Sequence, residues 1–259
     1  MTVPRVPART SARRGAAGGL SALLLALAVS ACSSEHRATS PGEVRELSAG
    51  APARKAREES EEHLRAVVRA YDEKTPLALG LVAVNDTCAG GGEKEWLARA
   101  EDDRYLIRCS MDVTAYYGTA PDRIGDVLDA VLTAGDRDAS DSDPATLIPF
   151  GHDDYRERLV GYYRDHGPNP SGPDAPEPTQ LSDPAHDVSW DTVRSSARTR
   201  VEEPDPCADD EGTVARCLRE PASRTVAELR EEYGLVLRVT LSAPGYYEAY
   251  KGDGTSGTR

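Results

Sequence analysis

The sequence predicts an α+β domain in which a mostly antiparallel sheet carries helices packed on one face, forming two layers. Segments 64–71 and 124–132 place apolar side chains three and four positions apart, which is the spacing of one helical face. Segments 105–117 and 235–241 alternate apolar and polar residues, as strands with one buried face do. A doubly wound parallel sheet is disfavoured because its strands would be apolar on both faces.

The first expected elements are a helix and a hairpin. The apolar spacing predicts a helix over residues 56–74, which ends before Pro76 because the residue preceding a proline avoids helical geometry. Residues 77–83 alternate as a strand that buries its odd-numbered side chains. A loop over 89–103 leads into the most regular strand of the chain, over 105–117, which also buries its odd-numbered residues.

A second helix and less regular segments follow. Thr119 is the expected cap of a helix that carries an apolar stripe and ends at Gly135. An acidic loop is predicted over 136–143 and a short strand over 146–150. Residues 155–163 have helical spacing but strand-like composition, so both alternatives stay open.

The last third of the domain contains two predicted strands and a helix. Six prolines make residues 167–186 a surface connection. Alternation predicts strands over 193–201 and 235–241, the second interrupted by Pro244 and Gly245. A capping box and a closing glycine predict a short helix over 225–234.

Charge narrows the classes of function. The chain has 259 residues, with 31 lysines and arginines and 44 aspartates and glutamates. The first 31 residues hold four arginines and no acid, so the remainder has 27 basic against 44 acidic residues, a net charge of −17. No nucleic-acid partner is expected, because non-specific binding requires a basic surface.

The N-terminus has the three parts of a secretory signal. Four arginines within residues 5–14 precede an uncharged, leucine-rich run over 15–28, and small residues follow. Val29-Ser30-Ala31-Cys32 resembles the lipobox of bacterial lipoproteins, in which the cysteine thiol is diacylglycerylated and the chain is cut just before it. The composition, typical of GC-rich coding sequence, is similar to that of secreted lipoproteins of actinobacteria.

This resemblance covers only the first 32 residues and implies a location in the cell. Residues 1–31 would be the signal peptide, and Cys32 would carry the lipid that anchors the protein at the extracytoplasmic face of the cell membrane. Residues 32–54 are expected to form a flexible tether, residues 55–251 a single domain, and residues 252–259 a disordered tail.

Two alternatives to the lipid anchor are weaker. An uncleaved transmembrane helix would need ~20 strongly apolar residues, more than the run before Cys32 supplies. Cys32 could also follow a conventional cleavage site by chance. The paired arginines Arg13 and Arg14 leave both the general secretory and the twin-arginine export routes open.

The remaining cysteines predict disulfides. An even number of cysteines in an exported chain indicates disulfide pairing. Cys88–Cys109 and Cys207–Cys217 are expected because each closes a short loop. Zinc is disfavoured because the chain has no Cys-x-x-Cys spacing, and no cofactor is expected.

No motif with catalytic spacing stands out. Gly90-Gly91-Gly92 lacks the following Lys-Ser/Thr of a phosphate-binding loop, and the acidic run from Asp136 lacks the glycine and glutamate of a calcium loop. His152 and Asp153 are adjacent, but no second histidine lies at a spacing suited to a metal. Eleven tyrosines allow a carbohydrate-binding platform, although tyrosine more often fills the edge of a core.

One surface pattern is a candidate ligand site. Strand alternation predicts a sheet face, turned away from the helices, that carries serines, threonines and five arginines: Arg108, Arg194, Arg198, Arg200 and Arg238. Such a face could bind an anionic envelope polymer or an acidic protein partner, because the guanidinium fork suits carboxylates and phosphates. The alternative is a solvated face neutralised by nearby acids.

These observations favour a membrane-anchored, extracytoplasmic lipoprotein that is a non-enzymatic binding or interaction module of the cell envelope. The alternatives are an extracytoplasmic hydrolase, with a site around His152 and Asp153, and a purely structural envelope protein.

Overall fold

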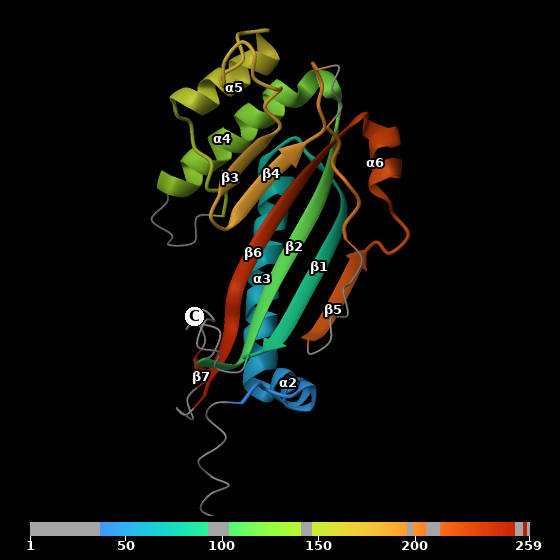
Figure 1. The fold of residues 1–259 in the computed structure, drawn as a ribbon. Helices are drawn as coiled ribbons and strands as arrows, with labels where there is room; N and C mark the ends of the chain where they lie inside the picture. The colour runs from blue at the N-terminus through green and yellow to red at the C-terminus, as the bar shows by residue number, and fades with distance from the viewer. Residues whose placement is uncertain are drawn as a thin grey trace, which may run out of the picture.

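The chain forms one antiparallel sheet with helices against it (Figure 1). The structure is a computed structural model that describes residues 37–92, 104–140, 147–195, 199–205, 213–251 and 256–257. The sheet has the strand order β3-β4-β6-β2-β1-β5, and β7 pairs with β6. In chain order the elements are α2 (Pro41–Ser48), α3 (Ala51–Lys74), β1 (Ala78–Gly90), β2 (Tyr105–Thr119), the 3-10 turn Pro121–Arg123, α4 (Ile124–Ser140), α5 (Asp154–Arg164), β3 (Gln180–Asp183), β4 (His186–Trp190), β5 (Thr213–Glu220), α6 (Val226–Tyr233), β6 (Leu235–Tyr250) and β7 (Ser256–Gly257).

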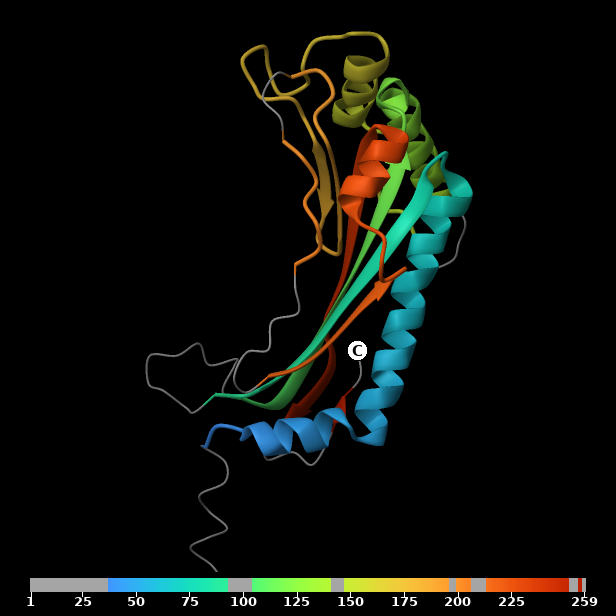
Figure 2. The same ribbon diagram turned by 90° about the vertical axis from the view of Figure 1, so that its right-hand side faces the viewer.

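α3 runs along one face of the sheet, as Figure 2 shows from the side, and the main core lies between the two. α3 buries one stripe, including Leu64, Val68 and Tyr71, against the central strands β2 and β6. β2 buries its odd-numbered side chains from Ile107 to Tyr117, because alternate residues of a strand point to the same face. The predicted α+β fold is therefore confirmed, as is the phase of the predicted strand over 105–117.

α4 and α5 extend this helical layer over one end of the sheet (Figure 1). α4 continues past Gly135 to Ser140, so the predicted helix end and the start of the predicted acidic loop are wrong. A Cβ on Gly135 would lie 2.3 Å from the carbonyl oxygen of Phe150, so this glycine allows the backbone of Phe150 to pass close to α4. Residues 147–150 form no strand but bury Ile148 and Phe150. α5 settles the open segment 155–163 as helix.

One helix departs from the predicted single helical layer. α6 lies over the opposite face, where Val226 and Leu229 pack with Leu81, Tyr116 and Val236 in a second, smaller core. Its N-terminus has the predicted capping box, and it ends at Gly234 with φ 89°. The structure thus has helices on both faces at this end of the sheet.

The predicted flexible tether is wrong from Ser40 onward. Ser40 begins α2 with a capping box, and Val44 of α2 is fully buried. α3 then starts at Ala51 rather than at residue 56. Residues 1–36, which include the predicted signal peptide and Cys32, lie outside the described part of the chain.

The second half of the chain differs most from prediction. The predicted connection over 167–186 contains β3 and the first residue of β4. The predicted strand over 193–201 is wrong, since its described residues have no strand geometry, and β5 was not predicted at all. Within the predicted disordered tail, residues 256–257 pair with β6 as β7.

β6 continues through the predicted break at Pro244 and Gly245. The two residues form an irregularity in its pairing with β2, where Cys109 lies opposite Tyr247 while Met111 lies opposite Ala243. Gly245 has φ 65°, which glycine adopts without strain. In β1, an irregularity between Leu79 and Leu81 reverses the predicted phase, so that even-numbered residues such as Val82 and Val84 face α3.

Candidate functional site

A groove of about 690 Å³ lies on the face of the sheet that is turned away from α3. We call it the open-face groove. Residues from β4, β6, β2, β1 and β5 form its floor, and residues 202–205 form its roof.

The floor is a polar row that crosses five strands. Strand register places Thr114 of β2 between Thr240 of β6 and Ala83 of β1. The row continues to Asp187 of β4 on one side and Arg219 of β5 on the other. In the next row Asp112 lies opposite Asn85 and accepts a 2.6 Å hydrogen bond from the hydroxyl of Ser242. Hydroxyl, amide and carboxylate groups therefore face the groove.

A buried ion pair fixes one side of the roof. Arg230 of α6 donates two hydrogen bonds to Asp191, from Nε to Oδ2 at 2.8 Å and from Nη2 to Oδ1 at 2.9 Å. Asp191 also accepts from the backbone N–H of Val201 at 2.7 Å, and Arg230 donates to the carbonyl of the same residue. Val201 is buried in the smaller core, so the chain enters the roof from a fixed point.

Glu203 fixes the roof a second time. Its Oε1 accepts from the backbone N–H groups of Val226 and Ala227 at the start of α6, at 2.7 and 3.2 Å. Its Oε2 pairs with Arg219 at 2.7 Å. Carboxylates are favoured at helix N-termini, where backbone N–H groups lack partners. The roof is therefore held on both sides rather than lying loosely over the sheet.

The groove is negatively charged. Among the described residues, its lining has five carboxylates, Asp112, Asp187, Glu202, Glu203 and Asp205, against the guanidinium groups of Arg219 and Arg238. Glu202 and Asp205 are exposed, and neither forms a hydrogen bond or ion pair with another residue of the described chain. Burial raises the pKa of Tyr116 to about 12, so this lining phenol is neutral at physiological pH.

The described members of the predicted arginine face do not gather at one site. Of its five members only Arg238 lines the groove, donating to Ser189 Oγ at 3.2 Å. Arg108 pairs with Glu248 at 3.3 Å, and the guanidinium of Arg194 lies 4.0 Å from the ring centroid of Tyr162. Arg200 is exposed outside any strand, and Arg198 lies outside the described residues. The prediction depended on a strand over 193–201, and the described residues of that range, 193–195 and 199–201, form none.

The Cys88–Cys109 disulfide is confirmed, with an S–S distance of 2.06 Å between paired residues of β1 and β2. Cys217 lies on β5 and is disulfide-bonded. Cys207, its predicted partner, lies outside the described residues, so the second pairing stays a prediction.

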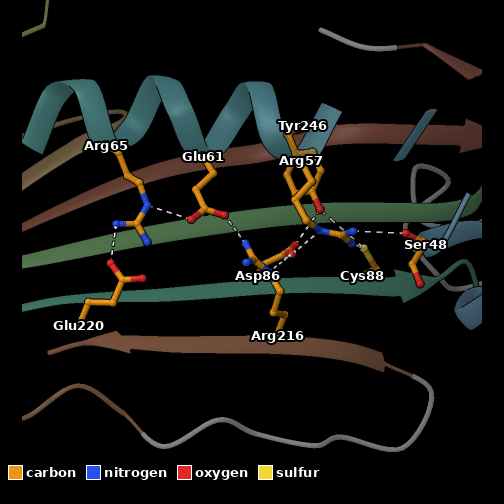
Figure 3. A network of polar contacts seen from close by, with 9 residues as sticks. All are labelled: Ser48, Arg57, Glu61, Arg65, Asp86, Cys88, Arg216, Glu220 and Tyr246. Carbon is orange, nitrogen blue, oxygen red and sulfur yellow. Dashed lines mark hydrogen bonds and ion pairs between the residues drawn. The ribbon is translucent and has the colours of Figure 1, made fainter. Parts of the chain in front are cut away.

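Beside this disulfide is a buried polar network, shown in Figure 3. Asp86 accepts hydrogen bonds from Arg57 of α3, Arg216 of β5 and the hydroxyl of Tyr246. Burial and the bond to Asp86 raise the pKa of Tyr246, which keeps it a neutral donor. Every member has a partner within the fold, so the network acts as a clamp between α3 and the sheet.

Glu61 and Arg65 extend the clamp along α3 toward the sheet edge. Glu61 pairs with Arg216 and Arg65, and Arg65 reaches Glu220 of β5 at 3.0 Å. Burial alone would raise the pKa of Glu61, but the hydrogen bonds from the two arginines outweigh it and lower the pKa.

His152 and Asp153, the predicted centre of a hydrolase, have separate structural roles. His152 lies between two carboxylates of α4, with Nδ1 2.5 Å from Asp136 and Nε2 3.2 Å from Asp129. Asp153 instead caps α5 by accepting from the N–H of Arg156 at 2.7 Å. Across the described residues, no group of three or more His, Cys, Asp or Glu side chains is placed to hold a metal ion.

Comparisons with known proteins found no relative of this chain. No family model, curated protein or solved structure matches this chain. Within the described ranges, no helix has both the length and the apolar character needed to span a membrane.

Sequence reasoning missed the carboxylates of the roof. Glu202, Glu203 and Asp205 belong to a segment with no apolar period, and only their density just before Cys207 marks them. Thr114 and Thr240 were placed correctly on the face turned away from the main helices, because their strands alternate regularly.

Proposed function

We propose that this chain is a bacterial lipoprotein, anchored through Cys32 at the extracytoplasmic face of the cell membrane, which binds a ligand in the open-face groove without catalysing a reaction. The lipobox-like Val29–Cys32 segment supports the location, and the Cys88–Cys109 disulfide fits an exported protein. The groove carries the proposal of binding, because its roof is fixed by Asp191 and by Glu203.

The composition of the groove supports binding over hydrolysis. The described part of its lining contains no histidine, and its one cysteine, Cys217, is disulfide-bonded and cannot act as a thiolate nucleophile. The alternative hydrolase around His152 loses support because both ring nitrogens of that residue face carboxylates of α4. Asp153 is engaged at the start of α5.

Lipidation is tested by the substitution Cys32→Ala. The wild-type protein should fractionate with membranes, and mass spectrometry should find a lipid-modified Cys32 at its N-terminus. The variant should stay uncleaved or leave the membrane fraction. An unmodified mature N-terminus at another residue would refute the anchor.

Binding in the groove is tested with a pair of matched variants. Thr114→Trp on β2 would fill the centre of the floor, whereas Thr87→Trp on β1 adds the same ring to the same face of the sheet, outside the groove lining. We expect Thr114→Trp to lose retention on isolated cell-envelope material and Thr87→Trp to keep it. Both variants must first show wild-type melting temperatures, and equal retention by folded forms of both would exclude the groove.

A further inference from the structure

We infer that the open-face groove takes an extended peptide segment with basic side chains. This inference rests on the proposed function and adds the charge and shape of the ligand. It reverses the expectation of an anionic ligand, which depended on an arginine face that the four described arginines do not form.

Charge complementarity is the first argument. In the described lining, five carboxylates outnumber two guanidinium groups, and one of these two, on Arg219, is already paired with Glu203. Glu202 and Asp205 remain exposed on the roof without a partner among the residues described. A cationic side chain entering the groove would gain these two carboxylates, whereas an anion would be repelled by them.

The shape of the groove is the second argument. Its floor crosses five strands, and with neighbouring strands ~4.8 Å apart it spans ~19 Å. An extended chain advances ~3.3 Å per residue, so this width accommodates about six residues. Thr114, Thr240 and Asn85 on the floor offer hydroxyl and amide groups that can bond the backbone of such a segment. The same floor would also suit a neutral sugar chain, which makes the charge dependence the deciding measurement.

The probe is a fluorescent peptide of three Lys-Gly repeats, and fluorescence anisotropy at low ionic strength measures its binding. The double substitution Glu202→Gln and Asp205→Asn should weaken binding about fivefold, because it removes two exposed ion pairs and each contributes only a small binding free energy. The control Glu46→Gln with Glu58→Gln removes two exposed carboxylates elsewhere and should leave affinity unchanged. A peptide of three Glu-Gly repeats should not bind, and added salt should weaken the Lys-Gly complex.

The substitution Arg238→Ala tests whether the groove prefers cationic or anionic ligands. Removing a positive charge from the lining should tighten the Lys-Gly complex about two- to threefold, because like charges no longer oppose each other. Arg45→Ala removes an exposed arginine of α2 and should change nothing. Weaker binding in Arg238→Ala would show that the site prefers anions and would overturn the inference.

A further pair of outcomes separates this inference from the proposed function. If the Lys-Gly peptide fails to bind but an N-acetylglucosamine trimer binds, and Thr114→Trp abolishes binding of the trimer, the inference of a basic ligand is wrong and the groove is still the binding site. If the Lys-Gly peptide binds equally well to folded Thr114→Trp, the groove is not the binding site, and both the inference and the proposed function are wrong.

Discussion

The carboxylate of Asp86 lies 2.5 Å from Nε of Arg57, at a depth where Asp86 is only 1% exposed. Tyr246 donates to the same carboxylate at 2.7 Å and Arg216 at 3.3 Å. One side chain of β1 therefore joins α3, β5 and β6. Because a buried carboxylate without these partners would be costly, the four residues are expected to act as a unit.

Asp86→Asn should destabilise the protein by about 3 kcal/mol, since it leaves Arg57 without its anion beneath α3. Urea denaturation measures this loss. Glu59→Gln is the control, because Glu59 forms an exposed pair with Lys55 and its removal should stay within about 0.5 kcal/mol. A loss below about 1 kcal/mol for Asp86→Asn would mean that the clamp contributes little net stability.

Cys109→Ala should cost ~2–5 kcal/mol of unfolding free energy, the range for native disulfides of small secreted domains. Cys109 is fully buried in the main core and bonded to Cys88 across β1 and β2. Chemical denaturation with and without reductant checks the magnitude. Non-reducing peptide mapping should also find Cys207 linked to Cys217, and a free thiol at either position would contradict that second pairing.

His152 should make stability depend on pH. Its hydrogen bonds to Asp136 and Asp129 raise its pKa above the ordinary 6.5, and burial opposes this only in part. The bond from His152 lowers the pKa of Asp136 below 3.8. The contribution of His152 is therefore fully present below pH 6.5 and is lost as the pH rises through its raised pKa. The contribution of Asp136 is lost only as the pH falls below 3.8.

The melting temperature of the wild-type protein should accordingly fall between pH 6 and 8 by more than that of His152→Gln. The effect will be modest because the cluster is partly exposed. His63→Gln, an exposed histidine of α3 with no ion pair in the described structure, should follow the wild type. Parallel curves for the wild type and His152→Gln would exclude a stabilising role for protonated His152.

Gly135→Ala should destabilise the protein by ~1–3 kcal/mol, although alanine is ordinarily the better residue inside a helix. The added Cβ would lie 2.3 Å from the carbonyl oxygen of Phe150 and 3.0 Å from that of Ile148. Both are backbone atoms, which cannot rotate away. Gly42→Ala in α2 meets nothing within 4 Å and should be neutral or stabilising by thermal melting.

Asp191→Ala should loosen the roof of the groove as well as lower stability. It removes the acceptor for Arg230 and for the backbone N–H of Val201, so faster hydrogen exchange at Val201 is expected. Binding of the Lys-Gly peptide should weaken even though no charge that contacts it is removed. Unchanged exchange at Val201 would show that the apolar contacts of this residue hold the roof without Asp191.

Regular elements with one buried face could be predicted from the sequence. β2 alternates strictly and α6 has both a capping box and a closing glycine, so each was placed to within about two residues. β5 could not be predicted in this way, because at the sheet edge both of its faces are half-buried and its residues do not alternate.

Over residues 193–201 the alternation predicted a strand that the described residues do not form. The alternation is real, but the backbone N–H groups of Val193, Arg194 and Ser195 bond the buried carboxylate of Glu177 instead of a neighbouring strand. A side-chain acceptor distant in the sequence replaces the ladder. The groove was unpredictable for a related reason, because its roof is positioned by ion pairs between segments far apart in the chain.

α2 also sets how far the domain can stand from a bilayer. The backbone N–H of Thr39 donates to the carbonyl of Gly91, so if Cys32 carries lipid, only six residues lie between the anchor and a residue docked on the fold. Fully extended, the segment from Cys32 to Thr39 spans at most ~25 Å. The end of the molecule that carries α2 would then stay close to the lipid headgroups, with α4 and α5 at the far end of the sheet (Figure 1). Any partner would have to meet the protein at the membrane surface.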